Sequence, residues 1–481
     1  MADSRKAQNH IHYLLNADNV KIDYDQEIRV HCVDFFSDLL GGAGPSSVLI
    51  QSDMELLLPF RCSVNQKTLL EKKFSSAEIK DAFFSLPSNK TSGRDGFSSE
   101  FFKGCWSVIG LEVIEAISEF FSSGCLLKQW NATTLVLIPK ITNAERTTDF
   151  RPISCLNTVY KVISKILASR LKWILEQVIP PYQSAFMPGR LLEENVLLAT
   201  DVVQGYNRKN IEPRGMLKLD IRKAFDSLSW DFILSALRAL RIPERFVNWI
   251  EECITTPSFS VCLNGNSSGF FSSTKGLRQG DPISPYLFVL AMEVFSKLLQ
   301  SKFDQGYIHY HPKTSGIALS HLMFADDVMI FFDGSEASLH GINEALDDFA
   351  SWSGLHMSKE KTQLFHAGLS HLDCEAIQRH GFPVGSLPIR YLGLPLMHRR
   401  LRVSEYEPLI QKVACRFKSW AVKMLSYAER AQLIASVISG IINFSISTFM
   451  LPRGCIKKLE SLCSRFLWLG KIDGGKGAKV S

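Results

Sequence analysis

The sequence lacks any Cys-x-x-Cys pair, and its 11 cysteines are scattered along 481 residues. Zinc ribbons and disulfide frameworks both depend on regularly spaced cysteines, so this absence argues against either kind of site. The chain also lacks a stretch with the basic-then-apolar layout of a signal peptide, internal repeats and low-complexity tracts. We therefore expect reduced thiols, mostly in the core of an intracellular protein.

Long uncharged runs are also rare. Residues 433–452 carry no charge and are about long enough to span a bilayer. Polar side chains interrupt the run at Ser436, Ser439, Asn443, Ser445, Ser447 and Thr448. We expect a buried helix here and no membrane insertion.

Neither sign of charge dominates, because 54 basic residues against 48 acidic ones give a formal net charge of +6. Such a balance is compatible with a cationic groove for nucleic acid, but an ordinary solvated surface explains it equally well. The hydrophobic content of 46% is enough for a large core, and the length predicts more than one structural unit.

The most informative pattern is the pair Asp326-Asp327, which interrupts the apolar run of residues 321–332. Apolar, β-prone segments on both sides predict a hairpin with the two carboxylates at its turn. Burying adjacent carboxylates without compensation is unfavourable, so a pair of divalent metal ions is one interpretation. An acidic turn in solvent is the other, and these residues alone leave both open.

A second carboxylate, Asp220, closes a strand-like run at residues 216–221. Two-metal phosphoryl transfer needs carboxylates from different strands around ions about 3.5–4 Å apart, and Asp220 with Asp326 would meet that need. Phe225 follows shortly after and would place a flat ring beside the site. Such a ring would exclude a ribose 2′-OH and select deoxynucleotides, although core packing also explains a phenylalanine.

Residues 276–285 lie between these motifs and combine two glycines with two prolines. Glycine permits close approach of backbone to a ligand, and Pro285 suits the first turn of a helix. Apolar residues then recur at helical spacing through Leu298. The pattern predicts a ligand-contacting loop that opens a buried helix, with Gln279 touching an incoming nucleotide or the template. A purely structural loop is the alternative.

In this order, Asp220 with Phe225, residues 277–285 and residues 324–327 resemble reverse-transcriptase motifs A, B and C. The residues of these motifs are similar to those in the polymerases of non-LTR (LINE-type) retrotransposons, most closely those of plants. Further segments resemble this family in order: residues 86–103 the N-terminal extension, 137–140 and 149–154 the fingers motif, 183–190 the next motif, 353–362 motif D, and 391–396 the primer grip.

The resemblance implies an α+β right-hand fold, with fingers, a palm built on an antiparallel sheet, and a helical thumb. It divides the chain into a linker-like segment at 1–60, an N-terminal extension of the fingers at 61–120, fingers and palm at 121–396, and a truncated thumb at 397–481. Relatives carry further segments at both ends, so we expect a polymerase core cut from a larger element. Nuclear localisation is expected from the family alone.

The implied activity is RNA-directed DNA polymerisation, which adds deoxynucleoside triphosphates to a primer 3′-OH on an RNA template. Asp220 and Asp326 would hold two Mg²⁺ ions, with Mn²⁺ as a possible substitute and Asp327 completing or supporting the cluster. The remaining roles fall on Lys140 and Arg151 (triphosphate), Gln279 and Gly280 (nucleotide pocket), and Lys361 (proton donor to pyrophosphate). A solvated turn lysine is the alternative for Lys361.

Two positions depart from the family pattern. Ser358 stands where motif D usually has asparagine, and Glu429 stands in the thumb where glycine is usual. Glu429 would put an anion near the duplex, which favours a second hypothesis, a catalytically idle nucleic-acid-binding remnant. A third hypothesis is an intron maturase-like protein, which would share the palm motifs.

Overall fold

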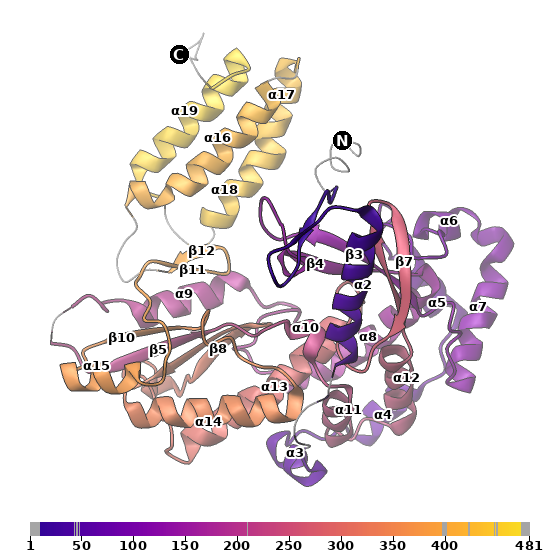
Figure 1. The fold of residues 1–481 in the computed structure, drawn as a ribbon, viewed down its shortest axis with the longest axis horizontal. Coiled ribbons are helices and arrows are strands. Elements are labelled where there is room, and N and C mark those ends of the chain that lie inside the picture. The colour runs from indigo at the N-terminus through magenta and orange to yellow at the C-terminus, as the bar shows by residue number, and fades with distance from the viewer. Residues whose placement is uncertain are drawn as a thin grey trace.

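The computed structural model describes residues 10–42, 44, 47, 49–208, 210–396, 402–421, 424–446, 448 and 451–472. Figure 1 shows a sheet covered by helices, a second sheet beside it with its own helices, and a helical bundle above them. We call these the palm, the fingers and the thumb. The expected α+β class is confirmed.

The palm sheet carries both aspartate motifs. Its strand order is β10 (Gln363–Ala367), β5 (Arg214–Leu219), β9 (Asp327–Phe332) and β8 (His321–Phe324), and every neighbouring pair is antiparallel. The strand predicted at residues 216–221 and the hairpin predicted around Asp326 are therefore confirmed.

Strand β9 is apolar on both faces because both faces are covered. Val328, Ile330 and Phe332 join the main hydrophobic core, whereas Met329 and Phe331 join a second cluster. Figure 1 shows α14 below the sheet and α9 above it. The bounds of the helices packed on the palm are Leu192–Val203 for α9, Ser284–Asp304 for α13 and Glu336–Ser353 for α14.

Helix α13 confirms the helix predicted after residues 276–285, with a proline in its first turn. It also buries Glu293, of which 1% is exposed, and neither carboxylate oxygen has a hydrogen-bond partner. The ammonium of Lys297 lies 3.5 Å from one of these oxygens. Burial raises the pKa of Glu293 to about 8, although Lys297 and Arg190 oppose the rise.

We expect Glu293→Gln to stabilise the protein at pH 8 and to have little effect at pH 5. The glutamate loses its proton near its ordinary pKa in the unfolded chain but only near the raised pKa in the folded one. Stability is therefore lost as pH rises between the two values, by on the order of 5 kcal/mol, and glutamine avoids this loss. Thermal unfolding at both pH values tests this, with the exposed Glu112→Gln as control. An equal pH dependence of Tm in the protein and in Glu293→Gln would contradict the expectation.

The fingers sheet is mixed. Its order is β4 (Phe150–Leu156), β3 (Ala132–Pro139), β6 (Ser258–Leu263) and β7 (Asn266–Ser272), with β3 and β6 parallel and the other pairs antiparallel. Asn264 and Gly265 form the turn between β6 and β7, and both have positive φ, as a two-residue hairpin turn requires.

The segment expected to be linker-like is an integral part of the fingers where the structure describes it. After the short strands β1 (Leu14–Leu15) and β2 (Lys21–Ile22), helix α2 (Asp25–Gly41) packs on β6 and β7. Its buried residues Ile28, Cys32, Phe36 and Leu40 recur every four positions and join a core with residues of β3, β4 and β6. This apolar stripe makes α2 part of the fingers core.

The remaining helices complete the fingers and palm. Ser75 caps the start of α5 by accepting a hydrogen bond from the backbone of Glu78. The bounds are α3 (Gln51–Leu57), α4 (Val64–Glu71), α5 (Ser76–Phe84), α6 (Ser99–Gly104), α7 (Trp106–Ser123), α8 (Thr158–Val178), α10 (Ala224–Ser227), α11 (Trp230–Ala239), α12 (Glu244–Thr255) and α15 (His371–Gln378).

A small hairpin of β11 (Ile389–Tyr391) and β12 (Leu394–Leu396) precedes the thumb. The thumb is a bundle with its own core, centred on Val413, Phe417 and Phe466. Its helices are α16 (Glu407–Ala421), α17 (Tyr427–Leu433), α18 (Ser439–Ile446) and α19 (Arg453–Leu469).

The uncharged residues 433–452 do not form the buried helix that we expected. A π-helical turn, Ile434–Ile438, separates α17 from α18, and within the described part of the stretch Ile438 and Thr448 are the buried residues. Because α16 and α19 supply much of the bundle core, α18 covers it from one side. Across the described chain, no helix is both long and apolar enough to cross a membrane.

Glu429 has a local structural role. It is the third residue of α17, and its side chain accepts a hydrogen bond from the backbone of Ser426, whose own side chain accepts one from Glu429 N. This reciprocal capping box accounts for an acidic residue at a helix start. The departure at this position therefore has an explanation other than loss of activity.

Candidate active site

The two aspartate motifs meet at one edge of the palm sheet. Leu219, the last residue of β5, is paired with Val328 on β9, so Asp220 emerges beside the turn between β8 and β9. Asp326 occupies that turn, next to Ala325 in the left-handed region at φ 55°. The structure thus brings together the carboxylates that the sequence predicted as partners.

Hydrogen bonds from distant segments fix both carboxylate-bearing backbones. Asp220 N donates to Thr362 Oγ1 at 3.2 Å, and Asp220 O accepts from Ser358 N at 2.8 Å. Gln183, which is 2% exposed, accepts from Ala325 N at 3.1 Å. The bond from position 358 comes from the backbone, so serine makes it without the asparagine that is usual there. The anchoring roles of Thr362 and Gln183 were not predicted from the sequence.

The carboxylates repel one another. The Asp326 side chain is exposed at the turn, yet the surrounding protein raises its pKa, the charge of Asp220 adds to the rise, and Arg151 and Lys218 oppose it. Burial likewise raises the pKa of Asp327, and both neighbouring aspartates add to it. A bound cation would relieve this repulsion.

Asp327 differs from the other two. It begins β9, and its carboxylate lies 3.9 Å from Lys218 Nζ. Within the part of the chain that the structure describes, no three Asp, Glu, His or Cys side chains form a ready ligand set for a metal ion. Asp220 and Asp326 fit as protein ligands in a site that phosphate and water oxygens complete, whereas Asp327 already has a cationic neighbour.

Phe225 lies on α10, and its half-buried ring stacks on Phe288 of α13 with centroids 4.7 Å apart. Its carbonyl accepts a hydrogen bond from Leu277 N at 2.6 Å. The core residue Phe288 therefore fixes one face of the ring. Both predicted roles, sugar selection and core packing, are compatible with this position.

Gln279 and Gly280 lie against the fingers sheet. Ser154 N on β4 donates to Gln279 O at 2.9 Å, and a Cβ added at Gly280 would come within 3.2 Å of Ser154 O. Gly280 has φ 112°, a conformation that strongly favours glycine. The loop tip and β4 are thus held in close backbone contact.

Asp226 lies in the same region and was not predicted as a site residue. Burial raises its pKa to about 6, whereas Lys223, Lys140 and a hydrogen bond from Gln279 oppose the rise. It also lines a cavity with Gln279 between fingers and palm. Its place in an ordinary-looking Phe-Asp-Ser run gave no signal of this role.

The basic residues predicted to act at the site also interact electrostatically. Lys140 Nζ donates to Thr148 O at 2.8 Å. Burial lowers the pKa of Lys140, the charge of Asp226 opposes this, and the charges of Arg151 and Lys361 lower it further. The structure thus brings Arg151 and Lys361 close enough to Lys140 for their charges to act on it.

The model of the reverse transcriptase (RNA-dependent DNA polymerase) family matches residues 138–396 of this chain. The chain belongs to this family. The matched segment contains every reverse-transcriptase site residue predicted above, from Lys140 to Lys361, and it covers the palm sheet and most of the fingers sheet.

The chain is also similar to proteins of transposable elements. The chain is 28% identical over 412 residues to the transposon TX1 uncharacterized 149 kDa protein of Xenopus laevis, covering 85% of this chain and 31% of that protein. It is 28% identical over 397 residues to the Pol polyprotein of the type-2 retrotransposable element R2DM of Drosophila melanogaster, covering 79% and 34%. The reverse transcriptase thus spans about a third of the length of these relatives.

A plant protein gives a shorter match. The uncharacterized mitochondrial protein AtMg01250 of Arabidopsis thaliana is 42% identical over 66 residues, covering 14% of this chain and 54% of that protein. The long matches above are to animal elements, so the expected plant type of this reverse transcriptase stays a prediction.

Proposed function

We propose that this chain is the polymerase of a non-LTR retrotransposon, which copies RNA into DNA by extending a primer 3′-OH. The single observation that carries the proposal is the pairing of Asp220 and Asp326. They lie at the ends of adjacent palm strands inside the family-matched segment, where the charge of Asp220 adds to the raised pKa of Asp326. Carboxylates gathered in this way are typical of a site for divalent cations.

Asp220 and Asp326 would hold Mg²⁺, with Mn²⁺ as a substitute. When bound, these ions supply positive charge to the attacking and leaving oxygens of phosphoryl transfer. Lys140 and Arg151 bind the triphosphate, arginine through its two-pronged guanidinium. The nucleophile is the primer hydroxyl, so no protein nucleophile is needed.

The other side chains select and orient the substrate. Phe225 crowds the 2′ position of the ribose, Gln279 and Gly280 line the nucleotide pocket, and Lys361 gives a proton from Nζ to the leaving pyrophosphate. Asp327, the first residue of β9, supports the cluster by holding Lys218 beside it. An RNA template, a DNA primer and deoxynucleoside triphosphates are the proposed partners, and the nucleus is the proposed location.

Primer extension tests the proposal. The purified chain, supplied with an RNA template, an annealed DNA primer, deoxynucleotides and Mg²⁺, should produce full-length DNA. Binding of template–primer without extension would instead favour the idle remnant. Binding restricted to one folded intron RNA, with promotion of its splicing, would favour the maturase-like protein.

We also expect template–primer affinity to fall steeply with salt, by about 10²-fold or more between 50 and 200 mM. Contacts to backbone phosphates release counterions, which makes binding depend on salt whatever the base sequence. Fluorescence anisotropy with two unrelated template–primer sequences checks this. Salt-insensitive binding would contradict a cationic groove.

A further inference from the structure

The loop that carries Gln279 and Gly280 is anchored by a buried ion pair on either side of them. Arg278 is 6% exposed and Asp281 2% exposed, and Arg278 Nη2 lies 3.0 Å from Asp281 Oδ2. The two residues between them form the tip that touches β4. Whatever fixes the pair therefore also fixes the tip.

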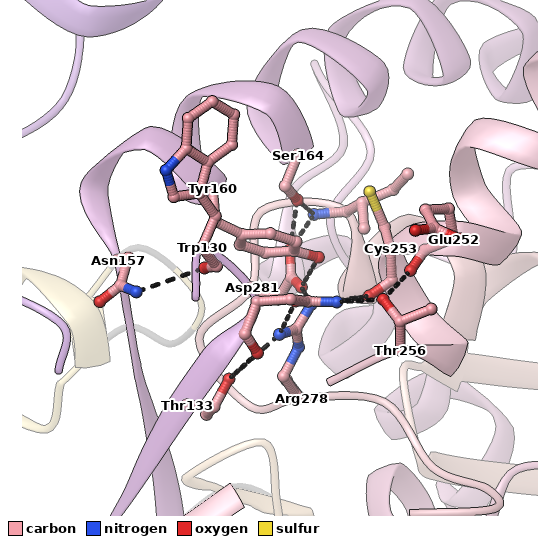
Figure 2. Close-up of polar contacts among 12 residues, drawn as sticks. Trp130, Thr133, Asn157, Tyr160, Ser164, Glu252, Cys253, Thr256, Arg278 and Asp281 are labelled. Atoms are coloured by element: carbon pink, nitrogen blue, oxygen red, sulfur yellow. Dashed lines mark hydrogen bonds and ion pairs between the residues drawn. The ribbon is translucent and has the colours of Figure 1, made fainter. Parts of the chain in front are cut away.

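Arg278 contacts several elements of the fingers at once. Its Nη1 donates to Asn131 Oδ1 at 2.6 Å and to Thr133 Oγ1 at 3.1 Å, where β3 begins. Its Nη2 donates to Cys253 O at 3.0 Å near the end of α12. The guanidinium also lies over the ring of Tyr160 on α8, 4.1 Å from the centroid. Figure 2 shows these groups converging on one guanidinium.

Asp281 extends the network along α8. Its Oδ2 accepts from Tyr160 Oη at 2.7 Å, and its Oδ1 accepts from Ser164 Oγ. The backbone N of Ile283, at the entry to α13, donates to Ser164 Oγ at 3.1 Å and to Asp281 Oδ1 at 3.3 Å. The pair thus ties β3, α8, α12 and the start of α13 to one loop (Figure 2).

A buried ion pair is a poor way to gain stability alone, because desolvation offsets the attraction and apolar residues of similar size often do as well. A network with so many satisfied bonds instead favours one geometry over others. Strand β4 also carries Arg151, which we propose to bind the triphosphate. Fixing the loop tip against β4 therefore sets the distance between Arg151 and Gln279.

We propose that the Arg278–Asp281 pair is a positioning device that holds Gln279 and Gly280 in register with β4, so that the pocket they line binds the incoming nucleotide. The proposal rests on the proposed polymerase function. Because Arg278 and Asp281 are buried and bonded to the fingers, in this proposal they act through the loop between them.

The main test replaces both charges together, as Arg278→Met with Asp281→Leu, so that no buried charge is left unpaired. Misplacing the tip should raise the KM for deoxynucleotides by about 10- to 100-fold. The Kd for template–primer should stay unchanged, and kcat at saturating nucleotide should change by less than about 5-fold. An unchanged KM in a folded double variant would overturn the proposal.

The fingers offer a control pair of similar geometry that is more exposed, with 12% of the Arg170 side chain and 37% of the Glu78 side chain accessible. Arg170 on α8 pairs with Glu78 at the same N–O distance of 3.0 Å and also lies over an aromatic ring, Phe74, at 3.5 Å. This pair joins α8 to α5 and has no contact with the loop. Arg170→Met with Glu78→Leu should leave the nucleotide KM unchanged. An equal rise in KM would show a general loosening of the fingers and would also overturn the proposal.

A milder variant covers the case in which the double variant does not fold. Tyr160→Phe keeps the ring under Arg278 and removes one hydrogen bond to Asp281. The nucleotide KM should rise by about 3- to 10-fold, in line with one hydrogen bond, with Tm nearly unchanged. A KM equal to that of the unmodified protein would count against the pair.

Amide hydrogen exchange separates this proposal from the proposed function. Peptides covering residues 276–283 should lose protection in the Arg278/Asp281 double variant but not in the Arg170/Glu78 control, whether or not the chain polymerises. No extension by the unmodified protein, together with this loss of protection, would reject the polymerase and leave the pair as the anchor of the loop. Unchanged protection would reject the pair as a positioning device.

Discussion

Replacing Asp326 by asparagine is expected to reduce primer extension by about 10³-fold or more. The amide keeps the shape of the side chain and can keep the turn next to Ala325, but it removes one of the two negative charges that Asp220 and Asp326 present together. Single-turnover extension of a DNA primer on an RNA template in Mg²⁺ measures the loss.

Binding and folding should not follow the loss of activity. Desolvation by the surrounding protein and the charge of Asp220 both disfavour the charged form of Asp326, so the neutral variant should be at least as stable as the parent. The Kd for template–primer should be unchanged. Asp347→Asn, at an exposed position on α14, serves as the control with full activity. Undiminished extension by Asp326→Asn would reject the metal-ligand role.

Patterns that depend on a residue's own neighbours predicted much of the fold. The apolar runs around Asp326 and before Asp220 predicted the central strands of the palm, and the prolines of residues 276–285 predicted the start of α13. These features follow from local geometry, because strand and turn residues have characteristic side chains whatever the rest of the chain does.

Which segments are buried against the rest of the fold was predicted poorly. Helix α2 was taken as part of a linker, although its apolar stripe has a partner only once β6 and β7 form. Residues 433–452 were expected to be buried, but α16 and α19 already supply much of the thumb core. Burial is set by tertiary packing, which hydropathy along the chain does not encode directly.

The same limit applies to the site. Asp220, Asp326 and Gln279 stand in recognisable motifs, so the sequence indicated them. The anchoring contact of Gln183, which stands in the motif at 183–190, and the buried place of Asp226 arise only through distant segments. Site residues with a recognisable motif can therefore be found from one sequence, whereas the groups that orient them require the fold.

Phe225→Ala is expected to raise the incorporation of ribonucleotides relative to deoxynucleotides by about 10- to 100-fold. Removing the ring opens space where a 2′-OH would otherwise clash, and discrimination by shape of this kind is worth a few kcal/mol at most. Ratios of kcat/KM for matched ribo- and deoxynucleotides on one RNA template measure the change.

The position of Phe225 makes a second variant necessary, because the ring also stacks on Phe288. Alanine removes both the stacking and the barrier to the 2′-OH, whereas Phe225→Tyr keeps the ring. If the ring selects the sugar, the tyrosine variant should retain the parent's preference for deoxynucleotides and the alanine variant should lose it. If Phe225 only packs the core, the alanine variant should have a lower Tm and an unchanged ratio. The nucleotide ratio, measured beside Tm in the same two variants, therefore decides between the two roles.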